Sequence, residues 1–394
     1  MTLARETQRI SDRARGIIAV TACGSIAGMG LGFVFPVLTL TMERWETPEA
    51  VIGLNSGMFA LSALLFSPLV PRFLGRFGVM RFLVACNGVM IACNLAFKAF
   101  ETLWLWFPLR FIGGCANNGL FVTSEIWVSE IASNNNRGRT IGLYSTSLTA
   151  GFLMGPLLLL VTGTEGWLPY LAGSALIAVA TLPLALARGR EPKFEEASTG
   201  ETLAMVKVTP TLILGGLMFG LLEASMFGFF PILGLRLGLS HDQAPLMVIA
   251  LSAGNLCCQL PIGWLADHID KRLLLAIGAF LSLVFALCMP LVGSAWWILF
   301  PLLFLWGGVV VGLYTLALAA LGDQFRGTQL AAANAALGTF YGFGAIIGPA
   351  LSGTAMQFFG PLGLTLSLAV FSGLYAVLSL YRLSQRLALR RTEP

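Results

Sequence analysis

The chain has 394 residues, of which 57% are hydrophobic and only 11% are charged, whereas soluble proteins carry about 25% charged residues. A chain this apolar cannot cover its hydrophobic residues within soluble cores, so most of it must contact lipid. The net charge of +5 comes from basic residues scattered singly among short loops, which excludes the basic face of a nucleic-acid-binding protein.

Twelve apolar segments follow one another along the chain, each long enough for the roughly 20 residues that a helix needs to cross a bilayer. The first segment exceeds the apolar region of a signal peptide, so we expect it to be retained as a membrane span. In chain order we expect spans at residues 16–42, 49–71, 80–98, 103–131, 140–162, 167–187, 210–235, 243–266, 273–293, 295–320, 329–356 and 360–382.

The Lys and Arg residues in the loops orient these spans, because cytoplasmic loops are richer in them. Twelve spans place both termini on one side of the membrane. The other side holds only Arg44, Lys98 and Arg236. We therefore expect both termini and the segment 188–209 to be cytoplasmic. The loop residues on this cytoplasmic side are Arg5, Arg9, Arg13, Arg15, Arg72, Arg76, Arg81, Arg137, Arg139, Arg188, Arg190, Lys193, Lys207, Lys271, Arg272, Arg326, Arg382, Arg386, Arg390 and Arg391.

The second half of the sequence repeats the first at an offset close to 194 residues. A shift of six spans preserves orientation, so we expect two parallel repeats of six helices each. Chance similarity among apolar helices is the alternative, and three matches at nearly one offset argue against it. The predicted domains are residues 1–187, a linker at 188–209, and residues 210–394. The matches pair residues 33–38 with 228–233, 111–114 with 305–308, and 151–156 with 344–349.

Over essentially its whole length the sequence resembles the major facilitator superfamily of membrane transporters. The second half carries the family's loop signature as Gly263-Trp-Leu-Ala-Asp267-His-Ile-Asp270-Lys271-Arg272, whereas the first-half copy at residues 71–78 lacks the Gly and the Asp. The resemblance implies an all-α fold, a polytopic membrane protein of twelve transmembrane helices, and transport by alternating access.

Three shorter runs resemble the YcaD-type branch of this superfamily. They are Ser124-Glu125-Ile-Trp127, Asn136-Arg137-Gly138-Arg139, and Ala331-Ala-Ala-Asn334 followed by Gly348-Pro349. This branch is identified mainly by sequence, so the resemblance implies no particular substrate.

Span 5 carries Gly142, Gly151 and Gly155-Pro156, which is most of a glycine pattern found in proton antiporters of the superfamily. Two further glycines of that pattern are absent, because leucines occupy residues 157–160. The glycines also lie near one helix face, where they would allow close helix packing. The pattern therefore favours either proton-driven efflux or packing alone.

Three ionisable residues lie inside the predicted spans, where a charge at mid-bilayer costs about 2.5–3.5 kcal/mol and needs a reason. They are Arg110 and Glu125 in span 4, and Glu223 in span 7. Helical spacing places Arg110, Asn117 and Glu125 on one face of span 4. The resemblance implies that spans 1, 4, 7 and 10 line a central cavity. Arg110 then contacts the substrate or the coupling ion, or it makes a structural ion pair.

Glu223 lies near the middle of span 7, beside Met226 and Phe227. An apolar surrounding favours the protonated carboxyl group, so Glu223 can exchange a proton near neutral pH. We expect it to couple protons or to hold a cationic group of the substrate. The alternative is a permanently protonated, hydrogen-bonding Glu. Both histidines, His241 and His268, lie in loops, so proton coupling must use carboxyl groups.

Gate residues are expected at the cytoplasmic ends of the spans. Glu125 is either a second coupling carboxyl group or a gate residue that pairs with Arg137 or Arg139. The resemblance implies that Asp267, in one motif with Arg272, approaches a helix N-terminus of the opposite half and locks the gate. A plain loop-capping role is the alternative for Asp267.

Aromatic residues fall into two groups by their position. Those at the outer helix ends, Trp104, Trp106, Trp296 and Trp297, are expected in the membrane interface. Those expected to line the cavity are Phe33, Phe35, Tyr144, Phe227, Trp306, Tyr314 and Tyr341.

These patterns predict a secondary active transporter that moves a small organic solute by alternating access, coupled to protons, with efflux favoured. One arginine and two carboxyl groups suit a cationic or zwitterionic solute better than a dianion. The alternatives are proton-coupled uptake of a small metabolite and a flippase for lipids or amphiphiles. The sequence lacks a phosphate-binding loop, a nucleophilic serine motif and a metal cluster, which argues against an enzyme.

The expected partners are the small-molecule substrate, protons and the lipid bilayer of a bacterial inner membrane, and we expect a monomer. We expect no nucleic-acid partner, no cofactor and no metal. The seven cysteines lie within apolar stretches and are interpreted as small hydrophobic residues.

Overall fold

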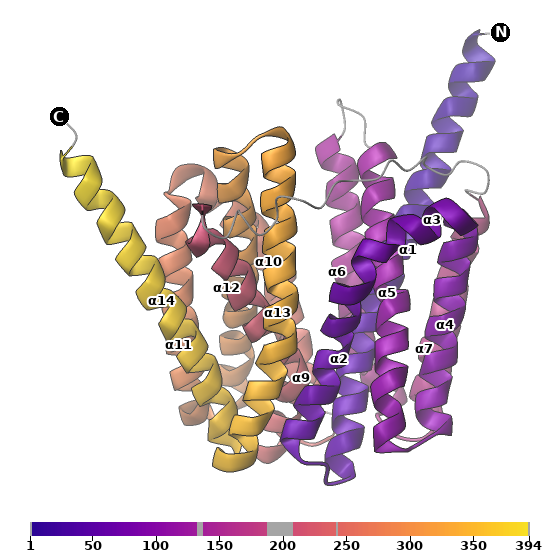
Figure 1. Cartoon of the computed structure of the whole chain (residues 1–394). Helices are drawn as coiled ribbons and strands as arrows, with labels where there is room; N and C mark the ends of the chain where they lie inside the picture. Colours follow the sequence, from indigo (N-terminus) through magenta and orange to yellow (C-terminus); the bar gives the residue numbers. More distant parts are fainter. Residues whose placement is uncertain (1, 132–136, 187–207, 242, 393–394) are drawn as a thin grey trace. The chain divides into compact units, whose positions relative to one another are not determined.

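The computed structural model describes residues 2–131, 137–186, 208–241 and 243–392, and these form a series of helices (Figure 1). The all-α fold class is therefore confirmed. The first helices are α1 (Thr2–Arg44), α2 (Glu49–Phe66), a 3-10 turn (Ser67–Leu69), α3 (Val70–Phe77), α4 (Val79–Ala99), α5 (Leu103–Ile131), α6 (Arg137–Thr162) and α7 (Leu168–Leu186). The later helices are α9 (Pro210–Arg236), α10 (Ala244–His268), α11 (Lys271–Val292), α12 (Trp296–Gln324), α13 (Gly327–Phe359) and α14 (Pro361–Thr392).

Ten helices among the described residues are long and apolar enough to cross a membrane, as expected for a multi-pass protein. α7 is shorter over its described apolar part, residues 168–184. α5, which carries Arg110, Asn117 and Glu125, is not among these ten helices. The count of twelve spans therefore stays a prediction.

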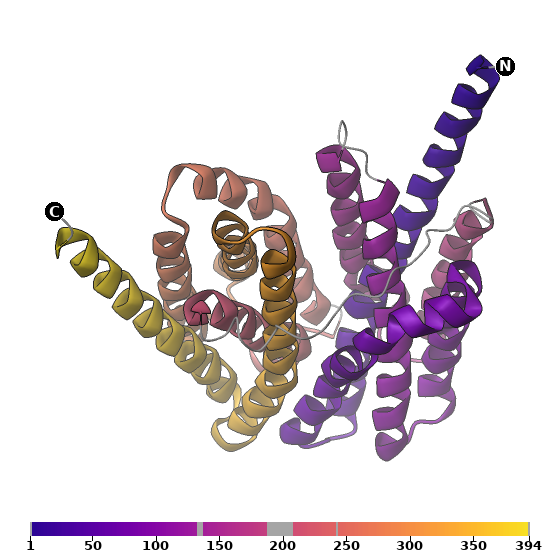
Figure 2. The same ribbon diagram turned by 45° about the horizontal axis from the view of Figure 1, so that its top comes forward.

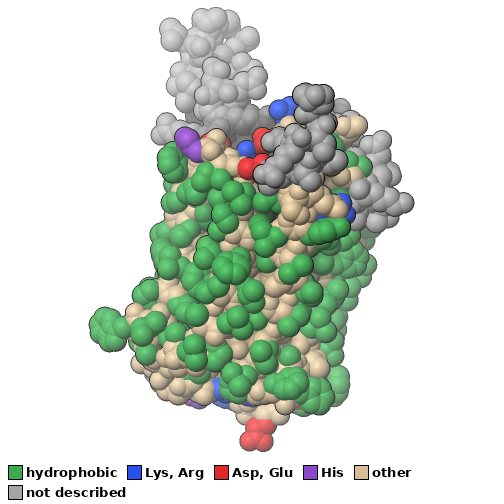
Figure 3. Space-filling model, turned by 90° about the vertical axis from the view of Figure 1, so that its left-hand side faces the viewer, with side chains coloured by type: hydrophobic (Ala, Val, Ile, Leu, Met, Phe, Trp, Pro, Cys, Tyr) green, Lys and Arg blue, Asp and Glu red, His purple; other side chains and the backbone are tan. Residues whose placement is uncertain are grey.

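Apolar side chains are exposed on the outer faces of the long helices. On α14, for example, Val370, Leu374 and Val377 are exposed. The space-filling view shows hydrophobic side chains across the middle of one face and charged side chains at its two ends (Figure 3). This distribution suits a bilayer, whose hydrocarbon core is about 30 Å thick.

The chain divides into two compact units. Unit 1 comprises Met1–Thr41 and Leu61–Ala197, and unit 2 comprises Met42–Ala60 and Ser198–Pro394. The sequence-based division placed residues 42–60 in the first half, whereas here they pack with unit 2. Most of the predicted linker, residues 188–209, lies outside the described residues, so the predicted domain boundaries remain a prediction.

In unit 1, glycines allow the backbones of α1 and α6 to lie in direct contact. A Cβ atom on Gly32 would overlap the carbonyl oxygen of Phe152, and one on Gly151 would overlap the carbonyl oxygen of Ser25. Gly142 of α6 has open space at its Cβ position among the described residues. Helix packing is therefore a sufficient reason for Gly151, but not for Gly142.

Unit 2 contains a matching approach of α9 to α13, which lie side by side in both views (Figures 1 and 2). A Cβ atom on Gly220 would overlap the carbonyl oxygen of Tyr341, and one on Gly344 would overlap that of Leu217. Gly344 is the residue that pairs with Gly151 in the sequence repeat. The two glycines thus have the same packing role in their own units.

One of the tryptophans expected at the membrane interface is instead part of the protein interior. Trp106 is fully buried, and its Nε1–H donates to the carbonyl oxygens of Phe97 at 3.1 Å and Phe100 at 3.0 Å. The prediction for Trp106 was therefore wrong, because its indole closes the turn between α4 and α5. Trp104 and Trp297 are exposed, as the prediction requires.

Candidate functional site

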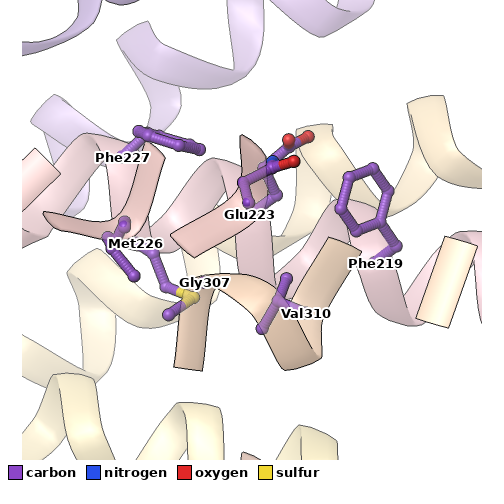
Figure 4. Close-up of a pocket in the computed structure, with 8 residues that line it drawn as sticks. Phe219, Glu223, Met226, Phe227, Gly307 and Val310 are labelled. Carbon is purple, nitrogen blue, oxygen red and sulfur yellow. The ribbon is translucent and has the colours of Figure 1, made fainter. Parts of the chain in front are cut away.

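A small pocket lies in unit 2 between α9, α10 and α12 (Figure 4), and the space free of atoms there is about 230 Å³ when the open solvent at its mouth is included. Among the described residues that line it, Glu223 is ionisable and Asn255 carries an amide, while the others are apolar. The pocket is therefore an apolar hollow with a carboxyl group in its wall. Its lining residues are Phe219, Glu223, Met226, Phe227, Leu251, Asn255, Gly307 and Val310.

Helical spacing explains how α9 supplies half of this lining. Phe219 precedes Glu223 by four residues, and Met226 and Phe227 follow it by three and four. Positions three and four apart are neighbours on a helix surface. In Figure 4 the carboxyl group of Glu223 lies between the rings of Phe219 and Phe227. Glu223 is thus at the middle of α9 and within an aromatic surface.

The carboxyl group of Glu223 has a hydrogen-bond partner on α13. The hydroxyl group of Tyr341 donates to Oε2 of Glu223 at 2.9 Å. The close approach of α9 and α13 brings these residues together, because Gly220 lies directly against the carbonyl oxygen of Tyr341. The bond fixes the direction of the carboxyl group.

Aromatic rings surround this hydrogen bond. The ring centre of Phe219 lies 5.3 Å from that of Tyr341 and 5.2 Å from that of Tyr314, and the two tyrosine rings are 6.1 Å apart. Aromatic faces attract cations within about 6 Å of the ring centre. Rings and carboxyl group together form a site that favours a positively charged group.

In unit 1, part of the polar face predicted for α5 is packed inside the protein. Arg110 is only 1% exposed, and its guanidinium carbon lies 4.5 Å from the ring centre of Phe35 on α1. Asn117 is also buried, and Gly30 on α1 leaves room for its side-chain oxygen. Both residues therefore join α5 to α1, and Phe35, expected in the cavity, is the cation–π partner of Arg110.

Glu125 differs from these two residues because it is exposed on α5. Its neighbour Ser124 is buried and shares a hydrogen bond of 2.8 Å with the hydroxyl group of Tyr144, a predicted cavity residue that is itself buried. The side chains of Arg137 and Arg139 lie outside the described residues. The pairing of Glu125 with either arginine therefore stays a prediction.

At the turn between α10 and α11, a residue of the loop signature contacts the end of α12. Asp267 is exposed at the end of α10. Oδ1 of Asp270 accepts a hydrogen bond from the backbone N–H of Arg272 at 2.8 Å, which caps α11. The side chain of Arg272 donates to Oε1 of Gln324 at 3.2 Å. Asp270 thus performs the capping that was considered for Asp267, and Asp267 remains a predicted gate residue.

Trp306 and Tyr314 share α12 but have different surroundings. Tyr314 contacts the ring of Phe219 beside the pocket. Trp306 is fully buried, donates from Nε1 to Oγ of Ser282 at 2.9 Å, and packs on Phe230 at a ring distance of 5.5 Å. Trp306 is not among the residues that line the pocket. Its contacts hold α12 against α9 and α11.

We expect Trp306→Phe to lower the free energy of unfolding by about 1–3 kcal/mol and to leave solute affinity unchanged, because it removes a buried donor and shrinks a buried ring. Thermal unfolding of the purified protein and solute titration measure the two effects. Unchanged stability with a selective loss of affinity would instead place Trp306 in the binding site.

Sequence reasoning missed most of the pocket lining, including Phe219 and Asn255. Phe219 lies one helical turn before Glu223, so the spacing could have identified it. Asn255 is a polar side chain inside the predominantly apolar α10. Because a polar side chain inside a membrane span is energetically costly, Asn255 could have been identified from the sequence as a candidate.

The sequence matches the profile of the Major Facilitator Superfamily over residues 20–240 and again over residues 212–393. The "uncharacterized MFS-type transporter YfkF" of Bacillus subtilis (strain 168) is 26% identical over 343 residues, which are 85% of this chain and 87% of the relative. The "uncharacterized MFS-type transporter YcaD" of Escherichia fergusonii is 27% identical over 360 residues, which are 89% and 92% of the two chains.

Solved transporter structures share the fold at low sequence identity. A bacterial homolog to the human lysosomal transporter Spinster, in an inward-facing and unoccupied conformation, has a TM-score of 0.76 at 14% identity and covers 93% of this chain and 95% of its own. The nucleoside transporter NupG has a TM-score of 0.74 at 15% identity, with coverage of 95% and 98%.

Proposed function

Because the chain belongs to the major facilitator superfamily, in its YcaD-type branch, we propose that it exports a small cationic or zwitterionic organic solute in exchange for protons. The family consists of secondary transporters rather than enzymes. The proposal includes twelve spans in two parallel six-helix repeats, with both termini on the cytoplasmic side of a bacterial inner membrane. The protein acts as a monomer in this proposal.

The observation that carries the proposal is the position of Glu223. Its carboxyl group lies at the middle of a membrane-spanning helix, in the wall of a pocket and beside three aromatic rings. An ionised carboxyl group at this depth is costly unless something neutralises it. A proton and a cationic solute can each do so, and one carboxyl group cannot serve both at once.

This competition produces exchange. A solute that binds on one side displaces the proton, and a proton that binds on the other side displaces the solute. Since bacterial membranes maintain an inward proton gradient, the exchange drives the solute outward. Gly151 and Gly155, part of the antiporter-type glycine pattern, are used for helix packing here, so the direction rests on Glu223 alone.

The test uses purified protein in liposomes that contain a pH-sensitive dye. A pH gradient is imposed, and cationic, zwitterionic and anionic solutes are added in turn. We expect proton movement with cationic or zwitterionic solutes and none with anions. Proton movement in the same direction as the solute would indicate uptake, and lipid-dependent signals without added solute would indicate a flippase.

A variant of the hydrogen-bond partner refines this test. In Tyr341→Phe, the ring remains but the donor to Glu223 is lost, so the ionised carboxyl group that binds the cation is less stabilised against protonation. We expect the solute concentration for half-maximal proton movement to rise about tenfold, in line with the loss of a charged hydrogen bond. An unchanged concentration would mean that this bond does not affect solute binding.

A further inference from the structure

Asn255 of α10 is the second polar side chain in the wall of the pocket that contains Glu223. It is half-buried, and no hydrogen bond links its side-chain amide to any residue that the structure describes. Other asparagines inside long helices donate to a neighbouring element, namely Asn87 to Thr181, Asn94 to Ser174 and Asn118 to Ser67. An amide without a partner is costly inside a membrane span. Asn255 is therefore suited to bind a group of the solute.

Close packing of α10 on α12 fixes the position of Asn255 in the pocket wall. A Cβ atom on Gly254 would overlap the carbonyl oxygen of Phe304, and one on Gly307 would overlap that of Leu251. The backbones of the two helices are therefore in direct contact on both sides of the neighbouring Asn255. Gly307 also lines the pocket and has no side chain that would fill it.

The aromatic rings near Glu223 pack on one another and do not form a cage. The rings of Phe219 and Tyr341 are stacked with their centres 5.3 Å apart, and Tyr314 packs on Phe219 at 5.2 Å. Rings at these distances are in contact, so no cation fits between them. On the other side of Phe219, the carboxyl group of Glu223 lies between this ring and that of Phe227 (Figure 4). The described residues thus form no ring-walled cage of the kind that holds a trimethylammonium group.

The pocket instead offers several hydrogen-bond acceptors. A primary ammonium group has three N–H donors, whereas a trimethylammonium group has none. The carboxylate of Glu223 has about four lone-pair sites, and the hydroxyl group of Tyr341 uses one of them. The side-chain oxygen of Asn255 is a further acceptor, supplied by another helix. These acceptors match a cation that carries N–H groups better than one that carries only methyl groups.

The size of the pocket limits how much of a solute it can hold. The space of about 230 Å³ includes the open solvent at the mouth, whereas pockets that enclose a drug-sized ligand measure about 300–1,000 Å³. One end group of the solute fits inside, and the remainder has to extend from the mouth. The chemistry of that end group therefore determines recognition in the pocket.

We propose that the pocket of unit 2 binds a primary or secondary ammonium group, with Glu223 balancing its charge and Asn255 accepting one of its N–H groups. The inference rests on the proposed transport of a cationic or zwitterionic solute, and it narrows that class to amines with N–H donors. Asn255 is the specificity-determining residue in this proposal. A buried group that expects a donor discriminates strongly against an analogue that lacks one.

The test measures the affinity of the purified protein for two benzyl cations by isothermal titration calorimetry at neutral pH. Protonated benzylamine has three N–H donors, and benzyltrimethylammonium has none. We expect benzylamine to bind about tenfold more tightly or better. In Asn255→Leu, we expect its affinity to fall about tenfold, as for the loss of a charged hydrogen bond, while the affinity for benzyltrimethylammonium stays the same.

Two further variants accompany this comparison. Asn255→Asp keeps a side-chain acceptor and should retain the preference for benzylamine. Gln259→Leu is the matched control, because it removes an amide one helical turn further along α10 and outside the pocket lining. It should leave both affinities unchanged.

Equal affinity of the unaltered protein for the two cations would overturn this inference and leave the proposed cation site at Glu223 intact. An equal loss of both affinities in Asn255→Leu would also overturn it, because that would indicate altered packing rather than a lost hydrogen bond. If the unaltered protein binds neither cation, the cationic solute of the proposed function is contradicted together with this inference. The comparison in the unaltered protein decides the question even if Asn255→Leu fails to fold.

Discussion

Glu223→Gln is expected to abolish solute-dependent proton movement in liposomes and to reduce the affinity for a cationic solute by about 10- to 100-fold. Glutamine keeps the size of the side chain and can still accept the hydrogen bond from Tyr341. It can neither bind a transferable proton nor balance a positive charge, and hydrogen bonds to charged groups contribute about 1.5–3 kcal/mol. The pH-dye assay and solute titration of the same preparation measure both effects.

The matched control for this prediction is Glu130→Gln, which neutralises an exposed glutamate at the end of α5. We expect it to retain coupled transport. If Glu223→Gln still moves protons with solute, the coupling carboxyl group lies elsewhere, and Glu125 is the next residue to replace. If solute crosses both proteins without protons, Glu223 binds solute or supports structure, and the carrier uses another ion or none.

Gly344→Val is expected to destabilise the protein by about 3 kcal/mol or more, enough to remove most of the folded protein from the membrane. The Cβ position of Gly344 overlaps the carbonyl oxygen of Leu217, so any side chain has to push α13 away from α9. A backbone atom cannot move aside as a flexible side chain can, which places this change at the severe end of overpacking. Size-exclusion chromatography of a fluorescent fusion measures the yield.

Gly338→Val is the matched control on the same helix, because open space surrounds its Cβ position among the described residues. It carries the same loss of glycine and the same added volume, so it should accumulate normally. In unit 1, Gly151→Val and Gly142→Val form the equivalent pair on α6 and should differ in the same direction. Equal yields within each pair would contradict the close helix approach described here.

Hydropathy and charge were sufficient to predict the membrane-spanning, all-helical character of the chain. They also placed Glu223 correctly at the middle of a helix, because a carboxyl group in an apolar span is visible in the sequence alone. The resemblance in the 263–272 loop and in span 4 was sufficient to identify the family. These features depend on composition along the chain rather than on contacts across it.

Contacts between helices could not be predicted in the same way. In a soluble helix an apolar stripe marks the buried face, but a membrane helix is apolar on all sides, so buried and lipid-facing residues look alike. Trp106 was therefore assigned to the interface although it is buried. Trp306 packs on Ser282 and Phe230 and does not line the pocket of unit 2, so its assignment to a central cavity stays a prediction.

Long-range pairs were similarly invisible in the sequence. Tyr341 meets Glu223, and Arg236 meets Glu43, across separations of 118 and 193 residues. Only the helix packing determines which residues meet at such separations. The glycines that permit the approach of α9 and α13 were recognised as a repeat, but their contact with the backbone at Tyr341 required the structure.

The most direct test of the central claim is the accumulation of a radiolabelled cationic solute in proteoliposomes with an imposed pH gradient. The exchange account predicts accumulation above equilibrium in the compartment from which protons leave, its collapse on addition of a protonophore, and its absence with Glu223→Gln. Equilibration of the solute that is the same with and without the gradient would contradict it.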